Sequence, residues 1–379
     1  MKIQLLLFGA ALAGLFTASN FFEKKKLNPQ VVENRPANSE GQRVESNFSK
    51  MEEPENPIEL GKVAWLRDFE LATERAKKEQ KPLLILFQEV PGCATCTRYG
   101  SLVLSHPLLV EAIETWFVPL CIFNNKGGSD RETLEKFNEP AWNNPVVRII
   151  STAKNEDVTP RISGNYSPNG LAEGILLALK KTGKTPPIWL ENLEKELNSI
   201  ENGPAEAIFS MPCFWTGEGK LGEMDGVIST EAGFMDGREV VKVGYDARLI
   251  SYENLVKKSQ EVGCAGKVFC QKSEEKRVAA TIVGEKSVAE KSHFRADRAS
   301  KYYLRQTPWR FVPMTPMQTA RANSLVGKSD SPEPVLSPRQ IELGRFAAEN
   351  GKLKWPNALD EADFKKAWGE ASKIKTTAN

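Results

Sequence analysis

The feature that most constrains the fold is a Cys-x-x-Cys pair, formed by Cys93 and Cys96, directly after a short apolar run. The run at 82–87 is uninterrupted, as expected of a strand that is buried on both faces. A helical pattern follows the pair, and backbone N–H groups at a helix start stabilise a thiolate. The pattern therefore predicts a redox-active dithiol, in which Cys93 attacks a disulfide and Cys96 resolves the mixed disulfide.

The segments around this pair alternate between helical and strand patterns. We expect a helix and further apolar strands before a last helix, at 64–78, 116–123, 145–150, 161–162 and 171–179. This order resembles the thioredoxin fold. Asn144-Pro145 falls where thioredoxins place a cis-proline beside the dithiol, so the resemblance implies that Pro145 contacts substrate. The lead-in Val90-Pro91-Gly92 is similar to that of thioredoxin-like proteins whose first redox position can be selenocysteine, which here is Cys93.

A second cysteine motif lies in the C-terminal half, where a short strand pattern at 207–210 leads into Cys213-Phe214-Trp215. Three further segments follow in order, with the sequences GVISTEAGF at 226–234, REVVKVGYD at 238–246 and LISYENL at 249–255. Together they resemble methionine sulfoxide reductase A, which has a GCFWG motif, a GVIST strand, an HAEVV strand and an ISYE helix. The resemblance covers about fifty residues and resumes at 301–304.

The resemblance implies a role for each of these residues. A sulfoxide sulfur is electrophilic, so a thiolate must attack it, and Cys213 is the expected nucleophile. The leaving oxygen must be protonated, and the family's acid corresponds to Glu239. Phe214 and Trp215 would form an apolar cup for the S-methyl group. Either Cys264 or Cys270 would then condense with the sulfenic acid on the nucleophile.

Two departures from the family pattern leave alternatives open. The loop between the two strands is reduced to Met235-Asp236-Gly237, and a cysteine-bearing segment at 264–270 stands where the family has an Asp and a Tyr. Cys213, Phe214 and Trp215 also fit a buried core, and Glu239 fits an exposed strand position. We expect Glu218, early in the helix after Cys213, to be solvated.

The composition leaves few residues for other kinds of catalytic or metal-binding site. There are six cysteines and two histidines, which is little material for histidine-based zinc or nucleophile sites. No second CxxC accompanies the first, so we expect no metal and no cofactor beyond redox-active cysteines. Cys121, within an apolar run, is expected to be an inert core residue. A net charge of +2 gives no reason to expect a nucleic-acid partner.

The N-terminus carries one lysine and an apolar run at 3–16, which is short for a membrane span and typical of a signal peptide. We therefore expect an exported protein, periplasmic or extracellular, or one anchored to a membrane by an uncleaved segment. The expected organisation is a signal peptide at 1–22, a flexible linker at 23–57, a thioredoxin-like domain at 58–185, a bridging helix at 186–203, a reductase-like domain at 204–325 and a tail at 326–379.

The predicted fold class is α/β, with a thioredoxin-like fold before a two-layer α/β domain. Three functions fit. The first is an oxidoreductase that reduces methionine-S-sulfoxide in oxidised peptides or proteins and is recharged by its CxxC domain and an upstream dithiol reductant. The second is a general thiol–disulfide oxidoreductase with a degenerate second domain. The third is a peptide-binding module without catalysis.

Overall fold

The computed structural model describes residues 54–154 and 156–378. The expected signal peptide and nearly all of the expected linker lie outside these residues. Within the described part of the chain, no helix is long and apolar enough to cross a membrane.

The first domain is built on a five-stranded sheet in the order β2-β1-β3-β4, with β5 also paired to β3. Its strands are β1 (Leu83–Gln88), β2 (Val118–Phe123), β3 (Val146–Ser151), β4 (Glu156–Asp157) and β5 (Ile162–Ser163). β1 runs parallel to β2 and antiparallel to β3, and all six of its side chains are buried. The position of β1 in the middle of the sheet explains why its sequence is uniformly apolar rather than alternating.

Helices cover both faces of this sheet. They are α1 (Phe69–Glu79), α2 (Ala94–Leu102), α3 (Pro107–Trp116), α4 (Ser129–Lys136), α5 (Pro168–Lys181) and α6 (Ile188–Asn202). Leu84 and Leu86 pack into one core, and Ile85 and Phe87 pack into the other. The predicted helix at 64–78 was wrong at its start: the Asp68 side chain accepts a hydrogen bond from the Leu71 N–H at 2.8 Å and caps the helix there.

The second domain has a six-stranded sheet in the order β10-β9-β6-β8-β7-β11. The strands are β6 (Ala205–Ser210), β7 (Val227–Met235), β8 (Arg238–Tyr245), β9 (Lys267–Cys270), β10 (Val288–Glu290) and β11 (Arg295–Ala296). β7 and β8 form a hairpin through Asp236 and Gly237, whose φ angles of 48° and 71° fit a tight two-residue turn. The shortened loop seen in the sequence is therefore a regular hairpin turn.

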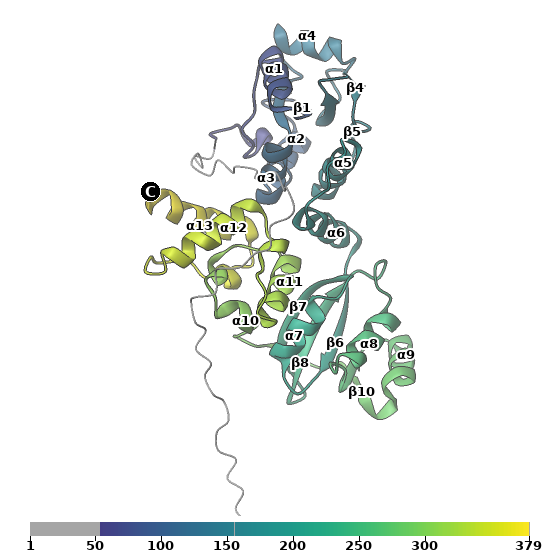
Figure 1. Ribbon diagram of the computed structural model, residues 1–379. Coiled ribbons are helices and arrows are strands. Elements are labelled where there is room, and N and C mark those ends of the chain that lie inside the picture. Colours follow the sequence, from purple (N-terminus) through teal and green to yellow (C-terminus); the bar gives the residue numbers. More distant parts are fainter. Residues whose placement is uncertain (1–53, 155, 379) are drawn as a thin grey trace, which may run out of the picture. The chain divides into compact units, whose positions relative to one another are not determined.

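The helices of this part are α7 (Phe214–Gly222), α8 (Tyr252–Glu261), α9 (Ser273–Val283), α10 (Tyr302–Arg305) and α11 (Pro316–Gly327). α7 packs on β7 and β8, and α11 packs against α7 (Figure 1). The core between α7, α8 and the sheet holds residues such as Phe209, Val241 and Leu255. The strand leading into Cys213 is therefore held at the centre of the sheet, between β8 and β9.

The C-terminal segment is also folded. It contains α12 (Pro338–Glu349) and α13 (Phe364–Ala378), and Leu343 and Ala371 of these helices share a small buried core with Val312. Short 3-10 helices occur at η2 (Ile58–Leu60), η3 (Glu285–Ser287), η4 (Pro308–Phe311), η5 (Glu333–Val335) and η6 (Ala358–Asp360). The segment expected to be a tail at 326–379 therefore contains the helices α12 and α13. The predicted α/β class is confirmed.

Candidate functional site

The first candidate centre is the dithiol at the start of α2. Cys93 is the residue that precedes the helix and is exposed, whereas Cys96 lies in the first turn and is buried. Their Sγ atoms are 3.5 Å apart. The two thiols are therefore placed to form a disulfide with little movement.

The two sulfurs differ in their electrostatics. The backbone N–H of Cys96 hydrogen-bonds to the Cys93 sulfur and holds the pKa of the Cys93 thiol below its ordinary value. Burial raises the pKa of Cys96 to about 11, and its thiol donates a hydrogen bond to Asn144 Oδ1 at 2.8 Å. The exposed sulfur is the better thiolate and the buried one stays protonated, as expected for an attacking and a resolving cysteine.

The turn before the dithiol is tightly packed. The Gly92 N–H donates to Glu59 Oε1 at 2.8 Å, and a Cβ at Gly92 would lie 2.6 Å from the Cβ of Cys96. Gln88 Nε2, buried behind the turn, donates to the Glu59 carbonyl oxygen at 2.8 Å. A glycine is therefore required in this lead-in, where thioredoxin has a tryptophan.

The expected proline lies in the loop before β3. The Asn144–Pro145 peptide bond is cis, as predicted, and Asn144 contacts the dithiol through the hydrogen bond from Cys96. Trp142, two residues before Asn144, is 83% exposed. No local sequence pattern marks Asn144, because its contact is with a residue 48 positions away in the chain. Substrate contact by Pro145 stays a prediction.

The second candidate centre is at the start of α7. Cys213 precedes the helix and is half-buried, directly after β6. The Phe214 N–H donates to Glu239 Oε2 at 2.8 Å, and the Met211 N–H donates to the Glu239 carbonyl oxygen at 3.3 Å. Glu239 is thus fixed by the pairing of β8 with β6, and its carboxylate is bound to the residue next to Cys213.

Aromatic rings surround this helix start. The Phe214 ring is 5.4 Å from that of Trp215 and 5.2 Å from that of Phe234, and the Trp215 ring stacks on Tyr302 at 4.1 Å. Trp215 Nε1 also donates to Asp297 Oδ2 at 3.2 Å. Phe214 is buried in the core while Trp215 is half-buried. Of the two predicted cup residues, Trp215 is the one with surface left for a ligand.

Glu218 is not solvated, and this expectation was wrong. Its side chain is fully buried, and it forms an ion pair with Lys301 Nζ at 2.5 Å. Glu218 also accepts hydrogen bonds from the backbone N–H groups of Ala232 and Lys301, and Lys301 Nζ bonds to the Thr230 carbonyl. Glu218 and Lys301 therefore bond to backbone groups of β7 in the way that a neighbouring strand would. The ion pair between them also connects α7 to β7.

Neither candidate resolving cysteine is hydrogen-bonded to Cys213 in the described chain. Cys270 lies on β9 in the core, where it pairs its sulfur with the Tyr252 hydroxyl at 3.2 Å. Cys264 is also buried and lies just before Gly266, whose N–H donates to the Ser210 carbonyl oxygen at 2.8 Å. Burial raises the pKa of both thiols.

The strand register places these two cysteines differently. Lys267 pairs with Ser210, close to the end of β6 from which the chain continues to Cys213. Cys270 lies three residues further from that end, or about 10 Å at the usual rise per residue. Cys264 therefore lies near the end of β6 from which the chain continues to Cys213, and Cys270 lies further from that end.

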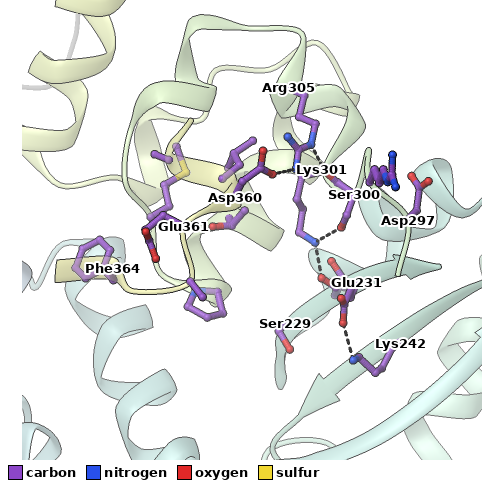
Figure 2. Close-up of a pocket in the computed structure, with 18 residues that line it drawn as sticks. Ser229, Glu231, Lys242, Asp297, Ser300, Lys301, Arg305, Asp360, Glu361 and Phe364 are labelled. Carbon is purple, nitrogen blue, oxygen red and sulfur yellow. Dashed lines mark hydrogen bonds and ion pairs between the residues drawn. The ribbon is translucent and has the colours of Figure 1, made fainter. Parts of the chain in front are cut away.

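A cleft of about 580 Å³ is lined on one side by Asp297, the residue that accepts the hydrogen bond from Trp215 (Figure 2). Charged side chains line it, including the ion pair between Glu231 and Lys242 and that between Arg305 and Asp360. It contains no cysteine and does not include Glu239. A second hollow of about 480 Å³, lined by Ala94, Thr95 and Arg98 of α2, lies next to the dithiol.

Comparison with known proteins supports both halves of this description. Residues 64–151 match the family model for thioredoxin-like domains. The chain is 40% identical over 67 residues to a peptide methionine sulfoxide reductase MsrA of Methanococcus maripaludis strain C7, covering 13% of this chain and 43% of that protein. It is 28% identical over 107 residues to MsrA of Vibrio vulnificus, covering 24% and 51%.

The chain spans about half the length of these curated relatives, or less. A solved structure titled DsbH Oxidoreductase aligns with 33% of this chain and 90% of its own, at 15% identity and a TM-score of 0.27. The chain thus combines a thioredoxin-like domain with a region related to peptide methionine sulfoxide reductase A.

Proposed function

We propose that this chain is an exported reductase of methionine-S-sulfoxide in peptides and proteins, recharged by its own thioredoxin-like domain. The observation that carries the proposal is the arrangement at the start of α7. Cys213 is the residue that precedes α7, and the Glu239 carboxyl group accepts a hydrogen bond from the backbone N–H of the next residue, Phe214. The similarity to MsrA proteins supports the proposed activity as a whole.

In the first step, the Cys213 thiolate attacks the sulfoxide sulfur while Glu239 gives a proton to the oxygen. The oxygen passes from substrate to enzyme, so that methionine leaves and Cys213 becomes a sulfenic acid. The substrate is reduced by two electrons and Cys213 is oxidised by two. Trp215, half-buried and stacked on Tyr302, would contact the S-methyl group.

In the second step, the thiol of Cys264 or Cys270 condenses with the sulfenic acid, which releases water and forms a disulfide. Cys93 then attacks this disulfide and Cys96 displaces the second-domain cysteine. The Cys93–Cys96 disulfide that results needs an external dithiol to reduce it. The lowered pKa of Cys93 and the 3.5 Å separation of the two sulfurs support this order of attack.

Export is proposed from the sequence alone, from the apolar run at 3–16 and the single lysine before it. An oxidising compartment outside the cytosol would expose methionine to oxidation and would also require a reductant delivered to the CxxC pair. The proposed chemistry uses only cysteine thiols as electron carriers.

A stereospecific assay tests the proposal. The reduced full-length protein is given peptides with methionine-S-sulfoxide or methionine-R-sulfoxide, and released methionine and free thiols are measured together. We expect loss of thiols in step with methionine from the S epimer only. Thiol loss to a disulfide substrate, with no methionine from either epimer, would instead identify a general thiol–disulfide oxidoreductase. Binding of the peptide without either change would identify a peptide-binding module.

A further inference from the structure

A carboxylate stands beside the dithiol, where the sequence motif contains only two cysteines. One carboxylate oxygen of Glu89 and the Sγ atoms of Cys93 and Cys96 all lie within 4.8 Å of one another. Among residues 54–154 and 156–378, no other group of three or more His, Cys, Asp or Glu side chains converges in this way. The Glu89 carboxylate is half-buried, and no described lysine, arginine or histidine forms an ion pair with it.

The turn between Glu89 and Cys93 creates this cluster. Its packing at Gly92 is so close that a Cβ there would lie 2.4 Å from the Glu89 carbonyl oxygen. The chain therefore folds back on itself between β1 and α2, which brings Glu89 alongside the two thiols. The spacing Glu-x3-Cys-x2-Cys does not by itself predict such a site, because only the tight turn brings the carboxylate close to the sulfurs.

The distances suit a tetrahedral metal. A Zn²⁺ ion bound at the usual zinc–sulfur distance of about 2.3 Å holds two thiolates about 3.8 Å apart. The two sulfurs are already 3.5 Å apart, so the metal needs almost no backbone movement. The Glu89 oxygen lies within 4.8 Å of both sulfurs, so a movement of at most about 1.3 Å brings it to a typical zinc–oxygen distance.

The ligand types narrow the choice of metal. Thiolates select Zn²⁺, Cu(I) and iron–sulfur clusters, and a carboxylate oxygen favours Zn²⁺ over Cu(I). We propose that Glu89, Cys93 and Cys96 form a Zn²⁺ site in the reduced protein, with a fourth position open to water on the exposed side of Cys93. This site is additional to the disulfide exchange proposed above.

The proposal links metal binding to redox state. Zn²⁺ requires both sulfurs as thiolates and releases their protons when it binds, so the Cys93–Cys96 disulfide offers no site. While the metal is bound, neither sulfur is free to attack a disulfide. Zinc would therefore hold the dithiol reduced and inactive until a chelator or a competing protein removes the ion.

The test uses the reduced full-length protein and Zn²⁺ alone, in competition with a chromophoric chelator. The variants are Cys93→Ser, Cys96→Ser and Glu89→Gln, with Glu156→Gln, an exposed carboxylate on β4, as the matched control. The cysteines of the second domain are unchanged in all of them, so differences between proteins report on this site. When Co²⁺ replaces Zn²⁺, the number of thiolate ligands can be measured from the intensity of the thiolate-to-cobalt charge-transfer absorption.

We expect the wild-type protein to bind more Zn²⁺ than either serine variant, and oxidation of the dithiol to remove the difference. Glu89→Gln should weaken binding by about tenfold or more, judged from what the loss of supporting groups costs at zinc sites. It should still form the Cys93–Cys96 disulfide, which shows that the turn is folded. Glu156→Gln should bind like wild type.

Equal Zn²⁺ binding by wild type and Cys93→Ser would overturn the proposal. An unchanged affinity in Glu89→Gln would overturn it too, because the third ligand would then lie elsewhere. No sulfoxide is present in this experiment, so its result is independent of whether the second domain reduces methionine sulfoxide.

Discussion

The two cysteine centres of this chain differ in how complete they are. At the dithiol, both reacting sulfurs are in place, 3.5 Å apart, with one exposed and one buried. At the second centre Cys213, the proposed nucleophile, and the Glu239 carboxylate are in place, but Cys264 and Cys270 are buried and contact other groups. The first centre has both sulfurs that the proposed disulfide exchange requires, whereas the second has in place only the residues for the first step of the proposed sulfoxide reduction.

This difference shows where movement is required in the proposed cycle. Reduction of the sulfoxide needs only Cys213, Glu239 and the aromatic side chains near them. For the second-domain disulfide to form, the buried thiol of Cys264 or Cys270 has to move away from its present neighbours. Gly263, with a φ of +73°, and the exposed Gly266 flank Cys264, so backbone freedom is concentrated at this cysteine.

The largest expected effect is on the nucleophile. Cys213→Ser should reduce sulfoxide reduction to background, because a hydroxyl is a poor nucleophile without an activating base. The disulfide-exchange activity of the first domain should be unchanged, and an insulin-type disulfide assay on the same protein checks this. Sulfoxide reduction at the wild-type rate would show that the two centres have been assigned wrongly.

The second effect concerns the acid. Glu239→Gln retains an acceptor for the Phe214 N–H but has no proton to donate to the leaving oxygen. We expect the rate of methionine formation to fall by about 10²–10⁴-fold, the usual contribution of general acid catalysis. Single-turnover kinetics across pH provides the measurement. If rate and pH profile both stayed as in wild type, another group would be the acid.

The third effect separates the two resolving candidates. Cys264→Ser should allow one turnover and then stop when electrons come only through the CxxC pair. Cys270→Ser should continue to turn over, since Cys270 lies beyond the paired part of β6 and away from Cys213. Methionine released per chain, with and without excess small-molecule dithiol, distinguishes them. The opposite pattern would mean that β9 rather than the Cys264 segment moves.

The smallest expected effect is on the pH dependence of the dithiol. Alkylation of Cys93 should reach half of its maximal rate at a pH below the ordinary pKa of a cysteine, because its pKa is lowered. Cys96 should resist alkylation until the pH approaches about 11. Mass spectrometry of the labelled peptides measures each cysteine separately. Identical profiles for the two residues would remove the distinction between attacking and resolving thiol.

The sequence predicted the parts of both centres that depend on local pattern. The strand before Cys93, the helix after it and the cis bond before Pro145 follow from apolar runs and from the thioredoxin resemblance. The order of β6, β7 and β8 around Cys213 follows in the same way.

What the sequence could not predict are contacts between residues far apart in the chain. Glu218 looked solvated because its neighbours in sequence are polar and small, and its partner Lys301 lies 83 residues away. The convergence of Glu89 with the dithiol depends on a turn whose packing has no sequence periodicity. Asp297 and Tyr302, both against Trp215, come from a segment where the resemblance was faint.

In the proposed cycle, electrons pass from the dithiol to the second cysteine centre, and a variant that traps the mixed disulfide between them would reveal this transfer. In Cys96→Ser, Cys93 attacks but the mixed disulfide is not released. After one oxidation with methionine-S-sulfoxide peptide, the protein is digested and its disulfide-linked peptides are identified by mass spectrometry. We expect Cys93 to be joined to a second-domain cysteine, with Cys264 favoured. Cys93 joined only to cysteines of foreign proteins would contradict it.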